Sequence, residues 1–393
     1  MAACSKPSRA VKELKAVLAE QKRNEIMTLK IISCDCVGGK PFSAASVVTQ
    51  EMLSTFQDFP TEKSCTLSFE DVWDVRKLRA LVEMNSDKDE KEDQDKDFPK
   101  KKRKLNRPNE EIEAFGNLEK YVFDLDYHIN CMKKVLKSSK DSRRMSGTEV
   151  VKVLNVHLFN PLSGGKCLID THITKEDSCV CSCGCGIQME KGPTGIGVES
   201  CWHGFVDMIV RGNQPVQVLQ STDPQEEVKM AVEVNKDEHL FDFISSQSSG
   251  YSQVIAETIT NSFAQVNKHP SLSGLPIPAF GCTPGQILVF AYDSHNDMLL
   301  KKMVDMKLFH EDVSAATIVM LWLYINFTSF MKRDITDTVR KPYLSEFKAE
   351  FCSSRSVVSC YKKAACGIVG FHHASNWPKL NFYSSANMTY IQE

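Results

Sequence analysis

Two acidic residues in the middle of the chain, Asp207 and Glu233, lie in or beside short apolar runs. A buried carboxylate without a partner costs free energy, so each must be paired, hydrogen-bonded or bound to a cation. Mg²⁺ prefers one or two carboxylates together with water and phosphate oxygens. A cation held in this way polarises a phosphodiester and activates a water for in-line attack. The two acids therefore predict metal-assisted hydrolysis, provided that the fold brings them together.

The surrounding pattern predicts the elements that would position these acids. Residues 202–210, 215–219 and 228–235 are expected to form three strands, and residues 250–266 a helix that carries Gln253. The run around Asp207 alternates poorly, which is typical of a central strand buried on both faces of a mixed sheet. If the three strands form an antiparallel meander, Asp207 and Glu233 converge at one sheet edge.

These residues resemble the PD-(D/E)xK nuclease superfamily over roughly residues 199–293. Asp207 matches the metal-binding aspartate, Glu233 the acidic residue of the (D/E)xK strand, and Gln253 a glutamine of the following helix. The strand at 286–293 would then follow that helix. The resemblance implies an α/β (α+β) fold: a restriction-endonuclease-like αβββαβ core with a mixed sheet, flanked by helical N- and C-terminal regions. It also implies Mg²⁺ or Mn²⁺ as cofactor and DNA as substrate, with RNA as the alternative.

The sequence departs from this pattern at one position that matters for catalysis. Asn235 stands where the superfamily has the lysine that stabilises developing negative charge, and asparagine supplies a hydrogen bond but no cation. Lys236 could supply the charge from the strand end, or Lys229 from the same strand face.

Other interpretations of the same residues stay open. Asp207 could cap a turn or pair with Arg211, Glu233 could pair with Lys229, and Gln253 could be an ordinary helical residue. The chain could accordingly be an inactive nuclease-like module that binds nucleic acid or a protein, or a zinc-stabilised nuclear adaptor.

The chain has fifteen cysteines but begins without an apolar signal segment, which favours reduced thiols in an intracellular protein. Four of them, Cys179, Cys181, Cys183 and Cys185, alternate with other residues. A regular strand would space these thiols about 6.8 Å apart, too far for one tetrahedral Zn²⁺, but Gly184 and Gly186 would let the chain fold around an ion. A zinc site and a loop of free thiols are both open; further candidate ligands are Cys167, His172, Cys201 and His203.

The composition, 42% hydrophobic and 25% charged over 393 residues, is that of a globular protein of two domains or one large core. With a net charge of −2, contact with nucleic acid must come from local basic patches. We expect an N-terminal region of unknown role at 1–84, with a helix at 8–27, and a charged linker at 85–108. The nuclease-like domain would span 109–310, beginning with a helix at 109–144, and a helical extension 311–393.

The linker contains an uninterrupted basic block behind a proline, which resembles a monopartite nuclear-localisation signal and predicts import by an import receptor. Its residues are Lys100, Lys101, Lys102, Arg103 and Lys104. A charge run that only solvates the linker is the alternative. The apolar run at 315–327 is too short to cross a bilayer, so it is expected to be a core helix, and no membrane partner is expected.

Overall fold

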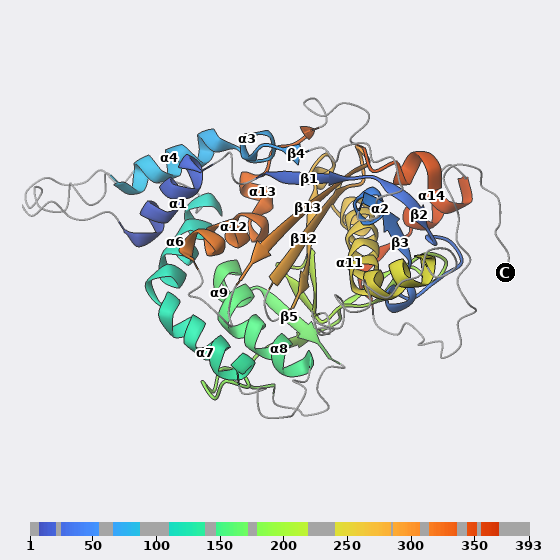
Figure 1. The fold of residues 1–393 in the computed structure, drawn as a ribbon. Coiled ribbons are helices and arrows are strands. Elements are labelled where there is room, and N and C mark those ends of the chain that lie inside the picture. The colour runs from blue at the N-terminus through green and yellow to red at the C-terminus, as the bar shows by residue number, and fades with distance from the viewer. Residues whose placement is uncertain are drawn as a thin grey trace, which may run out of the picture.

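The computed structural model describes residues 8–20, 25–54, 66–86, 110–137, 147–171, 179–218, 240–283, 286–306, 314–335, 344–351 and 355–368. It is a mixed α/β protein organised around a nine-stranded sheet with helices on both faces (Figure 1). The strand order is β4-β1-β13-β12-β11-β10-β9-β5-β6. All neighbours are antiparallel except β10 with β11 and β5 with β6, which are parallel.

The strands of this sheet come from most of the length of the chain. They are β1 (Ile26–Leu29), β4 (Thr66–Leu67), β5 (Cys167–Asp170), β6 (Glu190–Gly192), β9 (Met208–Val210), β10 (Gln214–Val218), β11 (Ile277–Cys282), β12 (Gln286–Asp293) and β13 (Met298–Asp305). Two small sheets lie outside it. One contains β7 (Gly195–Gly197), β8 (His203–Phe205) and β14 (Ala365–Ile368), the other β2 (Ile31–Cys34) and β3 (Val47–Thr49).

Two groups of helices cover the two faces of the main sheet (Figure 1). The first contains α1 (Arg9–Ala19), α3 (Phe69–Val72), α4 (Val75–Ser86), α6 (Glu110–Phe123), α7 (Leu125–Lys137), α8 (Gly147–Leu154), the π-helical turn η4 (Asn155–Phe159), α9 (Asn160–Ser163), α12 (Ala315–Ile325) and α13 (Phe327–Phe330). The second contains α11 (Leu240–Lys268), η2 (Phe42–Ala44), η8 (Phe347–Phe351) and α14 (Arg355–Tyr361). The short helices α2 (Gln50–Ser54) and η5 (Pro270–Leu272) complete the described helices.

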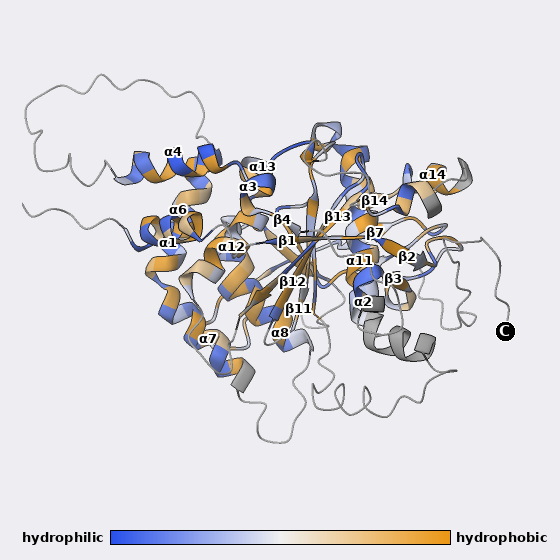
Figure 2. Cartoon of the chain, turned by 45° about the horizontal axis from the view of Figure 1, so that its top comes forward, coloured by the Kyte–Doolittle hydropathy of each residue, from blue (hydrophilic) through white to orange (hydrophobic). Residues whose placement is uncertain are grey.

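Alternation along the central strands divides the core into two clusters, as expected where successive side chains point to opposite faces. On β12, Ile287 and Val289 pack with the α12 group, whereas Leu288 and Phe290 pack with the α11 group. Figure 2 shows hydrophobic residues gathered along these strands, while α4 combines hydrophilic and hydrophobic stripes. Both faces of the central strands are therefore buried.

Helix α12 confirms the core helix expected within 315–327. Ser314 caps it by accepting a hydrogen bond from the Thr317 N–H, and nine of its eleven residues are buried around its whole circumference. Its Trp322 indole donates to the Ala114 carbonyl on α6 at 2.8 Å. In the described part of the chain, no helix is both long and apolar enough to cross a membrane.

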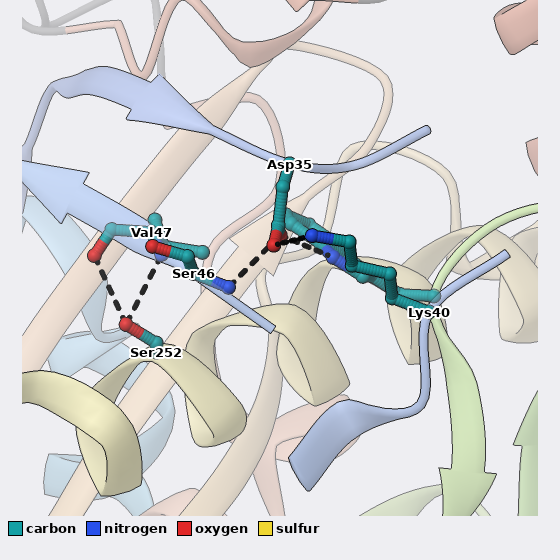
Figure 3. A network of polar contacts seen from close by, with 6 residues as sticks. Asp35, Lys40, Ser46, Val47 and Ser252 are labelled. Carbon is teal, nitrogen blue, oxygen red and sulfur yellow. Dashed lines mark hydrogen bonds and ion pairs between the residues drawn. The ribbon is translucent and has the colours of Figure 1, made fainter. Parts of the chain in front are cut away.

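A buried polar network ties the N-terminal β2–β3 segment to α11 (Figure 3). The Asp35 carboxylate accepts from Lys40 Nζ and the Ser46 N–H, both at 2.9 Å, and from the Trp202 indole at 3.0 Å. Ser252 on α11 donates to the Val47 carbonyl and accepts from the Val47 N–H, at 3.1 Å each. Because Asp35 is only 2% exposed, removing its partners would leave a buried charge uncompensated.

Several predicted elements differ from the structure. The helix expected at 8–27 ends at Ala19, because the pattern changes at Ile26 to the strand β1, and the helix expected at 109–144 is divided into α6 and α7. The N-terminal region is not only helical, since β1 and β4 belong to the main sheet. The strand after α11 is β11 and not the strand at 286–293, which is β12. The predicted linker with its basic block, from residue 87 onward, lies outside the described residues.

Candidate functional site

One edge of the main sheet collects the ends of four neighbouring strands. Strands β5, β10 and β11 run in the same direction and end there, and the antiparallel strand β9 begins there. Asp170 ends β5, Asp207 directly precedes β9, and Cys282 ends β11. The sequence therefore brings residues more than one hundred positions apart to one edge, which α11 covers on one face.

Asp207 is held in a fixed position by the hairpin that follows it. One of its carboxylate oxygens accepts from the Val218 N–H at 2.6 Å and from Gln217 Nε2 at 2.9 Å. Burial raises the pKa of Asp207 to about 6, the Val218 hydrogen bond opposes this shift, and the nearby Asp170 charge adds to it. The carboxyl group therefore titrates close to neutral pH.

Helix α11 adds a second carboxylate, Glu257, which is fully buried. Glu257 Oε1 accepts from Gln253 Nε2 at 2.9 Å, whereas its Oε2 is buried without a hydrogen-bond partner. Burial raises the pKa of Glu257 well above its usual value; the Gln253 hydrogen bond opposes the shift, and the Asp207 charge increases it. A buried acid with one unpartnered oxygen can be a protonated donor or can bind a cation.

Asp170 and Cys282 complete the surroundings of Asp207. The Asp170 N–H donates to the Asp207 carbonyl at 3.0 Å, which joins the end of β5 to the start of β9. The pKa of the Cys282 thiol is raised by burial and further by the Asp207 charge. Asp207 thus interacts electrostatically with both Asp170 and Glu257.

The predicted catalytic residues have different outcomes. Asp207 and Gln253 lie at this sheet edge, but Gln253 contacts Asp207's neighbour Glu257 and belongs to the site through it. Glu233, Asn235 and Lys236 lie outside the described residues, so their part in the site stays a prediction. The alternative pairing of Asp207 with Arg211 is wrong, because the Arg211 guanidinium donates to Asn326 at 2.9 Å.

A second cluster of chemically active side chains lies on the opposite side of the sheet, between η4 and the loop that follows β5. His157, Cys181, Cys183 and Cys185 place one candidate ligand atom each within 4.8 Å of all the others. Cys183 Sγ lies 3.0 Å from His157 Nε2 and 3.4 Å from Cys181 Sγ. This is a possible metal-binding site, and within the described ranges it is the one group of three or more such residues this tight.

Burial and the neighbouring side chains shift the pKa values of the groups in this cluster. Burial and the neighbouring His128 lower the pKa of His157 to about 4, so its imidazole is neutral at physiological pH. Burial raises the pKa of the Cys181 thiol. Burial also acts to raise the pKa of Cys183, but contacts from Cys185 and Cys181 outweigh it, and the net shift is downward.

The structure brings three of the four predicted cysteines, Cys181, Cys183 and Cys185, into one group that could hold a metal ion. Cys179 is buried in the same loop but outside the group, and His157 takes the fourth position. Gly184 and Gly186, with φ of +85° and +76°, provide the chain reversal that was expected of them. The further candidates Cys167, Cys201 and His203 lie elsewhere, and His172 is outside the described residues.

Three residues of these two sites were missed from the sequence, and two of them left a signal. Glu257 follows Gln253 by four residues and so shares its helix face, and Asp170 ends an apolar run as Asp207 does. His157 precedes the first cysteine ligand by more than twenty residues inside an apolar helical segment. No local spacing indicates it, because only the tertiary packing of η4 against the loop brings it to the thiols.

Comparison of the chain with protein-family models, with curated proteins and with solved structures gives no match.

Proposed function

We propose that the protein is a divalent-cation-dependent hydrolase of phosphodiester bonds whose site is formed by Asp207, Glu257 and Asp170. The observation that carries this proposal is that Asp207, directly before β9, interacts electrostatically with the buried Glu257 on α11, whose Oε2 has no hydrogen-bond partner. Their donor set consists of hard oxygen atoms, which suits Mg²⁺ or Mn²⁺. The cysteine–histidine group, with its soft thiols, suits a different ion.

The order of the elements supports this proposal. Helices α8 and α9 precede the antiparallel strands β5, β9 and β10, with β6, β7 and β8 inserted between β5 and β9; α11 follows, and β11 then returns parallel to β10. With β6, β7 and β8 taken as an insertion, this order is compatible with the αβββαβ core of the restriction-endonuclease-like fold that the sequence resembles. In that order the third core strand is β10, so the residue beside Asp207 on that strand is Gln217 rather than Glu233.

In the proposed reaction, each residue of the site would have a separate role. Asp207, oriented by the Val218 N–H and Gln217, and Glu257, oriented by Gln253, would hold the cation. A bound Mg²⁺ or Mn²⁺ would polarise the scissile phosphate and activate a water. Gln217 would hydrogen-bond the water or a phosphate oxygen, and Asp170 would add negative charge that strengthens cation binding.

A second candidate function, binding of nucleic acid without cleavage, is favoured by one specific observation. Within the described part of the chain, neither Asp207 nor Glu257 pairs with a lysine or arginine, and the side chain that contacts Asp207 from β10 is the neutral Gln217. A site without a cation beside the carboxylates lacks the group that stabilises developing charge. The basic block at Lys100–Lys104 supports a nuclear setting for either function.

The proposal is tested by incubating the purified full chain with plasmid DNA, single-stranded DNA and single-stranded RNA, with Mg²⁺, Mn²⁺ or EDTA. We expect cation-dependent cleavage of DNA that Asp207→Asn and Glu257→Gln each reduce to the level seen in EDTA. Glu83→Gln, which removes an exposed carboxylate on α4, is the matched control and should cleave as the wild type does.

The outcomes separate the two candidate functions. Binding of nucleic acid by the wild type, measured by calorimetry, combined with no cleavage of any substrate, would replace hydrolysis by nucleic-acid binding alone. Cleavage that survives both variants would place the chemistry elsewhere in the chain.

A further inference from the structure

We propose that His157, Cys181, Cys183 and Cys185 form a structural Zn²⁺ site that is separate from the hydrolytic site. The proposal starts from the geometry of four ligand atoms within 4.8 Å of one another, contributed by two segments that are distant in the sequence. It does not depend on the proposed function, because the acids act at the edge covered by α11 and these residues pack against η4 on the other face.

The distances fit a tetrahedral ion after a small expansion. With Zn–S arms of about 2.3 Å and a Zn–N arm of about 2.0 Å, the edges of the tetrahedron are about 3.5–3.8 Å. The observed separations from Cys183 Sγ, 3.0 Å to His157 Nε2 and 3.4 Å to Cys181 Sγ, are slightly shorter than these edges. Side-chain rotations that move the sulfur atoms by a few tenths of an ångström would open the space for the ion.

The imidazole of His157 is oriented by a neighbour, as is usual for a metal-bound histidine. His128 Nδ1 lies 3.2 Å from His157 Nδ1. If His157 binds the ion through Nε2, its Nδ1 carries the proton and donates to His128. His128 is in turn stacked on the Tyr121 ring, with centroids 4.7 Å apart, and the Tyr121 hydroxyl donates to the His157 carbonyl.

The backbone of η4 and of the cysteine loop positions the four candidate ligands. His157 lies at the centre of the π-helical turn η4, a rare geometry that is common at functional sites. In the cysteine loop, the Cys181 N–H donates to the Ile187 carbonyl and the Met189 N–H to the Cys179 carbonyl, which closes a narrow hairpin around Gly184 and Gly186. This hairpin turns Cys181, Cys183 and Cys185 toward one point.

The ligand set and burial indicate a structural rather than a catalytic ion. Four protein ligands leave no open position for water or substrate, as in structural zinc sites. Cys181 and Cys183 are each 4% exposed and His157 is fully buried. Three thiolates and one neutral imidazole around Zn²⁺ carry a net charge of −1, and Lys134, whose ammonium donates to the Cys183 carbonyl at 2.8 Å, lies close enough to offset it.

The role that follows is to hold the loop between β5 and β6 against α7 and η4. The described part of this loop, between Asp170 and Glu190, contains no strand of the main sheet. Its buried contacts with the helices come from the cysteine side chains. A zinc ion would join the two segments covalently and supply folding free energy that apolar burial alone does not provide there.

The first test measures zinc in the full-length protein as purified, by elemental analysis. We expect one zinc per chain, retained after dialysis and released by a thiol-modifying reagent. X-ray absorption at the zinc edge should show three sulfur ligands at about 2.3 Å and one nitrogen at about 2.0 Å. A chain without zinc that also fails to bind added Zn²⁺, or an ion with four sulfur ligands, would overturn the proposal.

The second test assigns the ligands by matched variants. Cys185→Ser and His157→Asn should lower the zinc content below half of the wild-type value, whereas Cys179→Ser and Cys131→Ser, which alter neighbouring thiols outside the group, should retain one zinc. Loss of zinc from Cys131→Ser with retention in Cys185→Ser would contradict the assignment. His128→Gln should retain the ion but bind it about 10–100-fold more weakly, as expected of a positioning residue.

The visible spectrum of the cobalt-loaded wild-type protein tests the site even if a variant does not fold. Co²⁺ in a tetrahedral thiolate site gives strong visible absorption, and the wild type and Cys179→Ser should share one spectrum. A weak octahedral spectrum from the wild-type protein would exclude the four-ligand site independently of any variant.

Discussion

At the scale of single residues, burial makes the ionised form of Asp207 unfavourable and so lowers the stability of the folded protein. Its folded-state pKa of about 6 lies above the value of about 3.9 expected in the unfolded chain. The folded state therefore binds more protons between these two values, and the stability associated with this group is present below pH ~4 and lost as pH rises through about 6. A buried carboxyl group with a raised pKa is a candidate for a functional group, which agrees with the role proposed for Asp207.

Asp207→Asn should consequently stabilise the metal-free protein at pH 7.5. The asparagine oxygen can still accept from the Val218 N–H, but it brings no charge into the site. We expect Tm to rise by about 2 °C relative to the wild type at pH 7.5 and the difference to disappear near pH 4, where the aspartic acid is neutral. Thermal unfolding followed by circular dichroism at both pH values measures this; an asparagine variant that is less stable at pH 7.5 would contradict it.

At the scale of elements, α11 presents a polar stripe where a buried helix would be expected to be apolar. Gln253, Glu257, Asn261 and Gln265 recur every four residues, so they share one helix face. Asn261 Nδ2 donates to the Asn213 carbonyl at 2.8 Å, and Gln265 Nε2 donates to Asn261 Oδ1 at 3.2 Å. The stripe therefore fixes the β9–β10 turn, and with it the hairpin that carries Asp207.

Asn261→Ala removes the donor to this turn and should destabilise the protein by about 1–2 kcal/mol, because the Asn213 carbonyl loses its partner in a part-buried setting. Urea unfolding followed by tryptophan fluorescence checks the free energy. Asn130→Ala, an exposed position on α7, is the control and should change the stability by less than about 0.5 kcal/mol. Equal effects of the two substitutions would show that the turn is held by other contacts.

The same elements show how far the sequence could be interpreted. Strand β10, the C-terminal half of α11 and the core helix α12 are predicted correctly, because each has a continuous pattern with clear ends. The N-terminal helix is predicted too long, because the switch at Ile26 from helical to strand periodicity takes only a few residues. Asp207 and three cysteines of the candidate metal group could be predicted because they interrupt local patterns in the sequence. The approach of His157 to these thiols, and the electrostatic interaction of Asp207 with Glu257, arise only from tertiary packing.

At the scale of the whole molecule, the N-terminal segment completes the central sheet rather than standing beside it. Strand β1 pairs antiparallel with β13, and Lys301 on β13, which is 8% exposed, places its Nζ 2.6 Å from Glu51 Oε1. Trp73 packs edge-on against Tyr324 of α12, with centroids 4.9 Å apart. The described residues before 87 thus cover both the edge of the sheet and the core helix.

Removing residues 1–109 should therefore prevent stable folding of the remainder. The truncation would expose the edge of β13, which invites intermolecular strand pairing, and would leave the buried Lys301 ammonium without Glu51, at a cost of about 3–5 kcal/mol. We expect the fragment 110–393 to be insoluble or aggregated in size-exclusion chromatography. The matched truncation 1–368 keeps every described element and should remain monodisperse with an unchanged Tm. A monomeric 110–393 fragment with a cooperative melting transition near that of the full chain would show that the nuclease-like part folds without the N-terminal strands.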